Sequence, residues 1–219
     1  YKRQGNVSST DAAYNALDGS TVDDVNMSNQ DNDSPGIILT VLNDDFSTSE
    51  SGDSVVVQFS LLSKPDGGES VTIPLSLDGP ANEMDLSADS ITILADNWDN
   101  PSSNTVIITG IDELFADGNQ ELILITGDPT SASPFYDAIG ADDVSNPTLT
   151  NEDDDVAQIV FNLSDNVSEN RTSSILSVSL TSAINTDVIL NFTVVDDTEL
   201  KTPWTRPAFS FSFIVSKPK

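Results

Sequence analysis

The sequence predicts an all-β protein whose antiparallel strands form a two-sheet sandwich. Apolar and polar residues alternate along several segments of strand length, which is the pattern of half-buried strands. Clusters of Gly, Pro, Asn and Asp separate these segments, and no segment has a convincing helical period. A series of roughly seven short strands without helices is typical of a β-sandwich.

The expected strands follow one another through the middle of the chain. A short apolar run covers 37–42, just after the turn residues Ser34, Pro35 and Gly36. Clear alternation covers 54–62 and, beyond the Asp66-Gly67-Gly68 turn, 71–77. Shorter period-two segments continue the series, with apolar pairs at Ile91 and Ile93, Val106 and Ile108, and Leu122 and Leu124. A last alternating segment carries Phe209, Phe211 and Phe213.

The charge of the chain is strongly one-sided. The 219 residues include 36 Asp plus Glu but only 8 Lys plus Arg, which gives a formal net charge of −28. Segment 34–155 holds 24 of the acids and a single base, Lys64. Such a field repels nucleic acids and anionic membrane surfaces, so we expect no nucleic-acid partner and no membrane insertion. Cations are the natural partners.

The absence of two residue types excludes several kinds of chemistry. There is no Cys and no His, which rules out thiol nucleophiles, Ser-His-Asp triads and Cys/His zinc sites. A carboxylate-pair glycosidase remains formally open, but clustered acids suit a metal better than acid/base work. We therefore expect no enzyme. No apolar run reaches 18 residues, so no transmembrane helix is expected, and the Asn/Ser/Thr-rich acidic composition fits the exterior of a bacterium.

Two acidic stretches point to a calcium site. Asp112, Glu113 and Asp117 lie around an Asp117-Gly118 turn that can fold their carboxylates towards one point, and the run Asp153–Asp155 ends the same segment. Like charges at this density repel one another unless a cation lies among them. Hard cations such as Ca²⁺ take six to eight oxygen ligands. The alternative is a solvated acidic loop.

Four short motifs carry a family resemblance. They are Thr-Ser-Glu-Ser-Gly around Glu50, Asp-Asn-Trp ending at Trp98, Val-Ile-Ile-Thr-Gly-Ile-Asp-Glu followed by Asp117-Gly118-Asn119, and Asn-Glu-Asp-Asp-Asp ending at Asp155. In this order they resemble the Calx-beta repeat, a family that includes regulatory domains of sodium–calcium exchangers and long arrays in bacterial surface proteins and adhesins. The resemblance implies an immunoglobulin-like antiparallel β-sandwich, repeated in tandem, that binds calcium at one end.

The resemblance also implies a set of calcium ligands at one pole of that sandwich. These would be Glu50, Glu83, Asp112, Glu113, Asp117, Asp153, Asp154 and Asp155, assisted by the carbonyl of Phe115. Asp85 is an alternative to Glu83, because both lie in the same strand entry. Gln120 stands where many family members have another acid, which leaves the number of bound ions open.

Internal matches divide the chain into one complete repeat and two partial ones. Residues 1–33 match the end of 34–155 at a spacing of 122, through Tyr14 and Tyr136, Asn29 and Asn151, Asp31 and Asp153, and Asp33 and Asp155. Residues 156–219 match its beginning and read as an incomplete or divergent third repeat. Glu169, Val178 and Leu180 match Glu50, Phe59 and Leu61 at 119, and Val188, Leu190, Phe192 and Val194 match Val71, Ile73, Leu75 and Leu77 at 117.

These observations predict a calcium-binding structural repeat of a secreted or cell-surface protein. Calcium at the junction between repeats would stiffen the array as a spacer or adhesive stalk. The alternative is a subunit of an extracellular fibre that assembles head to tail by strand complementation between partial repeats. The expected partners are neighbouring repeats or copies of the same protein, and possible further partners are a cell-surface or carbohydrate ligand bound on Trp98, Tyr136 or Trp204. Trp98 fits a packing role better.

Overall fold

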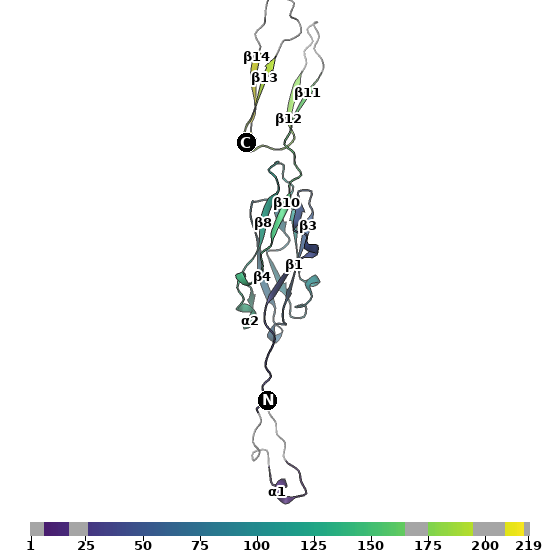
Figure 1. Ribbon diagram of the computed structural model, residues 1–219, viewed down its shortest axis with the longest axis vertical. Coiled ribbons are helices and arrows are strands. Elements are labelled where there is room, and N and C mark those ends of the chain that lie inside the picture. The colour runs from purple at the N-terminus through teal and green to yellow at the C-terminus, as the bar shows by residue number, and fades with distance from the viewer. Residues whose placement is uncertain (1–6, 18–25, 165–174, 195–208, 217–219) are drawn as a thin grey trace, which may run out of the picture. The chain divides into compact units, whose positions relative to one another are not determined.

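The computed structural model describes residues 7–17, 26–164, 175–194 and 209–216, with 42% of them in strands and 11% in helices. The chain divides into two compact units, residues 1–34 and 35–219 (Figure 1). The prediction of an all-β chain built from antiparallel sheets is confirmed at this level. The predicted counterpart Glu169 and the aromatic residue Trp204 lie outside the described residues.

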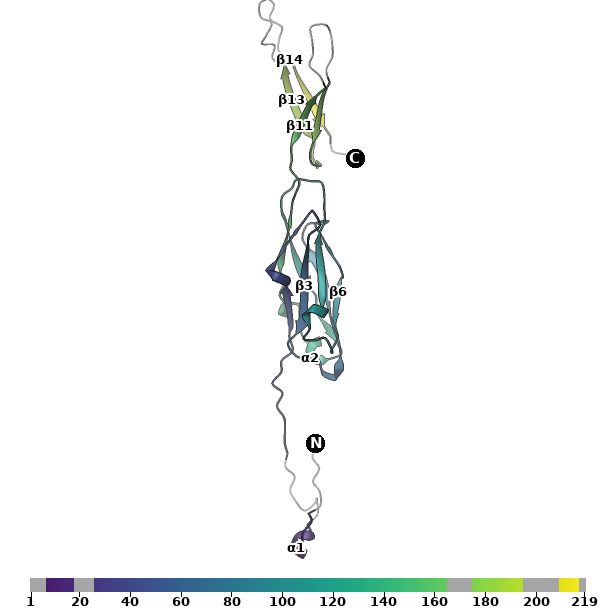
Figure 2. The same cartoon turned by 90° about the vertical axis from the view of Figure 1, so that its right-hand side faces the viewer.

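Two sheets make up the part of the second unit that ends at residue 155. One has four strands in the order β1 (Ile37–Val41), β3 (Ser54–Leu61), β7 (Thr105–Gly110) and β5 (Met84–Leu86). The other has the order β2 (Ser47–Ser49), β10 (Thr148–Glu152), β8 (Gln120–Thr126), β4 (Val71–Asp78) and β6 (Ser90–Ile93), with β9 (Thr130–Ser131) beside β4. Figure 2 shows β3 and β6 in the view turned by 90°.

The two sheets share one apolar core. Along β3 and β7 every second side chain is buried, as the alternation predicts for strands with one face inward. Fully buried residues come from both sheets, including Phe59 and Ile108 from one and Ile73, Leu124 and Leu149 from the other. Burying such side chains stabilises the fold by roughly 1.5–3 kcal/mol each. The molecule is therefore sandwich-like in this segment.

One strand pair departs from the antiparallel prediction. Among the described strands, only β2 and β10 pair in parallel, with Thr48 opposite Asn151. The chain leaves β1 through the short η1 turn (Leu42–Asp44), where Asn43 and Asp44 have positive φ angles of 62° and 54°. It then joins the other sheet at its edge, running in the same direction as β10. Strands β2 and β10 were missed by the alternation, because neither has an apolar period. Strand β5 was predicted only as a strand entry, because its three residues carry a single apolar pair, Met84 and Leu86.

The described helices are all single turns. They are α1 (Ala12–Asn15), α2 (Pro134–Asp137) and the 3₁₀ turns η1, η2 (Asp66–Gly68), η3 (Pro101–Ser103) and η4 (Ala141–Asp143). None within the described ranges has the length and apolar character that a membrane crossing requires.

Tyr136 in α2 is the largest fully buried side chain. Its hydroxyl donates to the carbonyl oxygen of Ser63 at 2.5 Å and accepts from the Ser63 backbone N–H at 3.2 Å. Trp98 packs against the same core, as expected for a structural tryptophan. Because Tyr136 is inside the core, it is not available as a surface platform for a sugar.

The turn α1 repeats the local hydrogen bonding of α2 at the predicted spacing of 122. Asn15 N donates to Asp11 O just as Asp137 N donates to Ser133 O. The hydroxyl oxygen of Ser9 accepts from the N–H two residues later at 3.1 Å, and that of Ser131 does so at the same distance. The burial differs, because Tyr14 is 61% exposed and Tyr136 only 1%.

The C-terminal part forms two hairpins, β11 (Ile159–Leu163) with β12 (Leu176–Leu180) and β13 (Val188–Val194) with β14 (Phe209–Val215). The first hairpin pairs in the register of β1 and β3: Ile159 faces Leu180 as Ile37 faces Leu61. The second pairs in the register of β4 and β6, with Val188 opposite Val215 as Val71 is opposite Ile93. All five residues of β11 are exposed, in contrast to the half-buried β1.

Tyr136→Phe should destabilise the protein by about 1–2 kcal/mol, because the change leaves the backbone groups of Ser63 without their partner. Urea unfolding at low protein concentration measures the loss. Tyr14→Phe is the matched control, and it should leave stability unchanged because its hydroxyl is in water. Equal effects of the two changes would contradict the structural role of the buried hydroxyl.

Candidate metal centre

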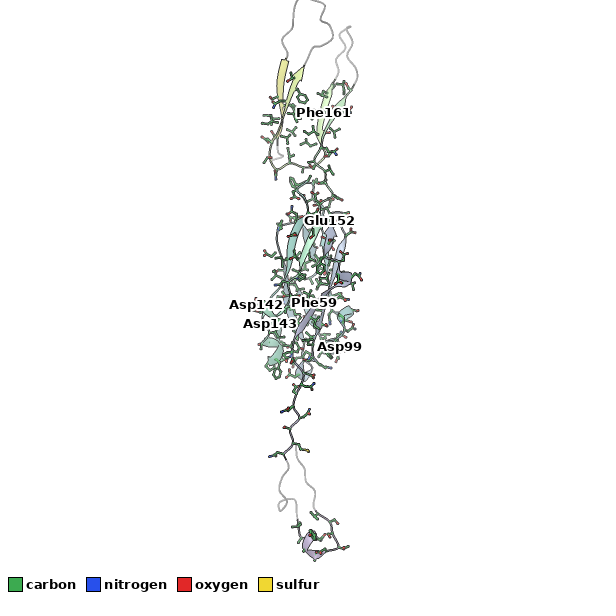
Figure 3. All side chains as sticks on the ribbon, in the orientation of Figure 1. Phe59, Asp99, Asp142, Asp143, Glu152 and Phe161 are labelled. Carbon is green, nitrogen blue, oxygen red and sulfur yellow. The ribbon has the colours of Figure 1, made fainter. Side chains whose placement is uncertain are left out.

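Four segments bring acids to one end of the sandwich. Glu50 follows β2, Glu83 precedes β5, Asp112, Glu113 and Asp117 lie between β7 and β8, and Asp153–Asp155 follow β10. We call this set of residues the acidic pole. Parallel pairing makes β2 and β10 end together, and the Glu50 N–H donates to Glu152 O at 3.1 Å. Figure 3 shows Glu152 at the end of β10, and Phe59 inside the same body.

The absence of a side chain at Gly110 lets these segments approach closely. A Cβ atom at this position would lie 2.2 Å from the carbonyl oxygen of Ser49 and 2.5 Å from Oδ1 of Asn151. Only glycine fits there without a shift of the backbone. The loop after β7 thereby starts beside Glu50.

Two groups of carboxylate oxygens converge on Glu50. One comprises Glu50, Glu113 and Asp117, and the other comprises Glu50, Asp112 and Asp154, each with its ligand atoms within 4.8 Å of one another. Such spacing allows one cation to contact all members of a group. Glu50 belongs to both groups, so it is the centre of the arrangement.

The Glu50 carboxylate is buried and only partly satisfied. The residue is 2% exposed, and its Oε2 atom has no hydrogen-bond partner among the described residues. Burial raises the pKa of Glu50 from 4.5 to about 7, against a hydrogen bond from the Asp154 backbone that lowers it, and the charges of Asp153, Glu113 and Glu83 raise it further. A buried carboxylate with one oxygen that accepts no hydrogen bond is unfavourable unless it is protonated or bound to a cation.

Two other carboxyl groups of the acidic pole also have raised pKa values. Burial is the main cause that raises the pKa values of Glu113 and Asp155, and neighbouring carboxylates add to it. The Oδ2 atom of Asp155 is buried and likewise lacks a partner within the described part of the chain. The pole is therefore short of positive charge.

Buried and loop polar residues hold the acidic pole in place through hydrogen bonds. Asn151 is 1% exposed; its Oδ1 accepts from Thr48 Oγ1 at 2.8 Å, and its Nδ2 reaches Glu83 Oε2 at 3.5 Å. Asn119 Oδ1 accepts from the Asp153 N–H at 3.2 Å. Thr48 and Asn119 were not identified from the sequence as supporting residues, because their role depends on a parallel strand pair and a loop contact.

The structure brings together most of the predicted ligands. Five of the nine belong to the two groups: Glu50, Asp112, Glu113, Asp117 and Asp154. Asp153 instead accepts from the Gly118 N–H at 2.6 Å, and Asp155 N donates to Asp153 Oδ1 at 2.8 Å.

The remaining predicted ligands lie at the edges of the two groups. Glu83 is buried and contacts Asn151, whereas its alternative Asp85 is exposed on β5 opposite Thr109. The N–H of Phe115 donates to Glu113 Oε1 at 3.0 Å, and no contact assigns its carbonyl to either group. Gln120 donates to the Gly118 carbonyl at 2.9 Å and so holds the turn.

In the presence of a chelator, the protein should lose stability as the pH rises from about 4.5 to 7. Folding raises the Glu50 pKa above its ordinary value, so the native state keeps a proton that the unfolded chain has released across this window. Glu50→Gln should remove most of this pH dependence of the unfolding free energy. It should also stabilise the metal-free protein at pH 8 by about 2 kcal/mol. Urea unfolding between pH 4.5 and 8 measures it, and a variant profile parallel to the wild type would contradict the buried charge.

Gly110→Ala should destabilise the protein by about 1–3 kcal/mol, because the new methyl group meets backbone and a buried amide rather than a flexible side chain. Gly140→Ala is the control, since its nearest atom would be 3.8 Å away and its φ of −94° suits any residue. Thermal unfolding compares the two. Equal, small effects would mean that the pole tolerates a wider strand spacing.

No protein-family model matches the chain, and no curated protein matches its sequence.

Proposed function

We propose that residues 34–155 are a calcium-binding, immunoglobulin-like sandwich module of a tandem array in a secreted or cell-surface protein. Calcium rigidifies the module, which acts as a spacer or adhesive stalk. The observation that carries this proposal is the Glu50 carboxylate, buried, without a partner for Oε2 among the described residues, and common to both groups of convergent oxygens. A divalent cation at this point would satisfy that atom and neutralise its neighbours.

The donor set favours calcium over other metals. The chain has no His or Cys, so the pole offers oxygen atoms alone. Softer metals such as Zn²⁺ prefer nitrogen and sulfur, and Mg²⁺ demands a compact octahedron and keeps much of its water. Ca²⁺ accepts six to eight oxygens in variable geometry, which suits carboxylates supplied by several loops. Binding would also release the proton that burial retains on Glu50.

Calcium at this pole would act as a mechanical cross-link. The ligands come from the ends of β2, β7 and β10, which are separate in the sequence. Asp153–Asp155 also connect the sandwich to the segment that follows, so an ion held there would restrict the connection. The same local turn occurs one spacing earlier, where Asp33 N donates to Asp31 Oδ1 at 3.1 Å as Asp155 N does to Asp153. A stiff array is the expected product.

A fibre-forming subunit is the second candidate. It is favoured by the hairpins β11–β12 and β13–β14, which keep the registers of β1–β3 and β4–β6 although large apolar residues on them are exposed. Phe161, Ile189 and Phe213 are examples, each at least 50% exposed. Exposed sheet faces of this kind favour a protein partner, and a copy of the same chain supplies matching strands.

Excess Ca²⁺ should raise the melting temperature of the whole chain relative to chelator. A hundredfold excess over the dissociation constant corresponds to about 2.7 kcal/mol of stabilisation. Glu50→Gln should abolish most of this rise, because it replaces the carboxylate that belongs to both groups with a neutral amide. The control Glu121→Gln removes an exposed acid of β8 and should keep the rise. Circular dichroism measures both, and a wild type indifferent to calcium would refute the metal site.

A further inference from the structure

The second unit contains an apolar cavity outside the acidic pole. It has a volume of about 250 Å³, and its lining includes Ile159, Leu180, Ser182 and Val188, from β11 to the start of β13. Its walls are mainly aliphatic, and Gln158 and Ser182 are its polar residues. A cavity of this size and composition accepts a single large side chain with a polar tip.

Each of these four residues has a counterpart in the complete sandwich. Ile37, Leu61, Ser63 and Val71 precede them by 122, 119, 119 and 117 residues respectively. The identical strand registers support the mapping, since Ile159 faces Leu180 as Ile37 faces Leu61. The cavity is thus the counterpart of a region that is filled in the sandwich.

Tyr136 is the buried side chain that reaches Ser63 in the sandwich. It is a member of the core cluster that also contains Leu61 and Val71, and Ile37 packs against that cluster. Its hydroxyl bonds to both backbone groups of Ser63 and lies 3.2 Å from the Ser63 hydroxyl. By analogy, the cavity beside Ser182 suits an aromatic ring whose hydroxyl group reaches the serine.

The chain carries a second copy of this side chain in the same local setting. Tyr14 has the same position in α1 that Tyr136 has in α2. The hydrogen bonds around it match as well, since Asp11 N donates to Ser9 Oγ and Asn15 N donates to Asp11 O. It is 61% exposed, and Met27, the counterpart of the fully buried Leu149, is 87% exposed. Two residues whose counterparts are core are therefore left in solvent.

We propose that the cavity beside Ser182 binds Tyr14 of a second copy of the chain, with α1 docked as α2 docks in the sandwich. This inference rests on the fibre-forming alternative above, and it names the residue that anchors one copy to the next. The charge distribution favours this contact: residues 156–219 hold six acids and five bases, whereas 34–155 hold 24 acids and one base. The receiving region is thus the part of the chain that repels an acidic partner least.

The test measures the self-association of the full chain. Sedimentation velocity is run over a range of protein concentrations with Ca²⁺ present. The wild type should associate as its concentration rises, and Tyr14→Ala should weaken this at least about tenfold. Tyr14→Phe and Ser182→Ala should each weaken it about fivefold by removing the same hydrogen bond. Adding Ser182→Ala to Tyr14→Phe should cause no further loss, because the hydroxyl that the serine side chain would contact is already absent.

Phe135→Ala is the matched control. Its ring is 62% exposed, close to that of Tyr14, but it lies beside the anchoring position in α2. Association should be unchanged in this variant. A wild type that stays monomeric throughout, or a Tyr14→Ala variant that associates as well as the wild type, would overturn the proposal. Closure of Tyr14 onto the cavity of its own chain would give the monomeric outcome.

Failure here and failure of the calcium proposal are distinguishable. The same samples are melted with Ca²⁺ and with chelator, and Tyr14→Ala should retain the full calcium-dependent rise. A retained rise without association rejects the anchor alone. Association without a calcium-dependent rise supports the anchor and rejects the metal site.

Discussion

Packing of two sheets on one core is the constraint on which the rest of this structure depends. Because β3, β4, β7, β8 and β10 must each bury one face, their positions and their ends are fixed together. The acidic pole is a consequence of that arrangement. Loops far apart in the sequence emerge at one end, and their charges come within a few ångströms whether or not the electrostatics favour it.

The core thus holds the pole in an unfavourable state. Glu50 is drawn inward by the parallel pairing of β2 with β10, while Gly110 lets the neighbouring loop approach it. Protonation reduces the repulsion between the buried carboxylates at low pH, and a divalent cation would reduce it at neutral pH. An ion bound at the pole would in this way make the stability of the fold depend on its concentration.

Repetition of the sequence has a physical meaning that differs along the chain. The same residue pattern gives a closed core between 35 and 155, where both halves of the sandwich are present, and exposed hairpins beyond it. Local hydrogen bonds and strand registers survive in both settings, because they depend on neighbours along the chain and across one hairpin. Burial needs the opposite sheet. Tyr14 and Tyr136 show this contrast at a single position.

The sequence by itself determined the β class, the main strands and the identity of the acids. Period-two alternation is a local property, and the crowding of Asp and Glu around Gly118 is visible without any fold. Only the tertiary structure decided that Glu50 is the buried centre, that Glu83 rather than Asp85 points inward, and that Asn151 supports them. These facts depend on a parallel edge pair and on which face of a three-residue strand turns to the core. Short segments without an apolar period carry no signal for either.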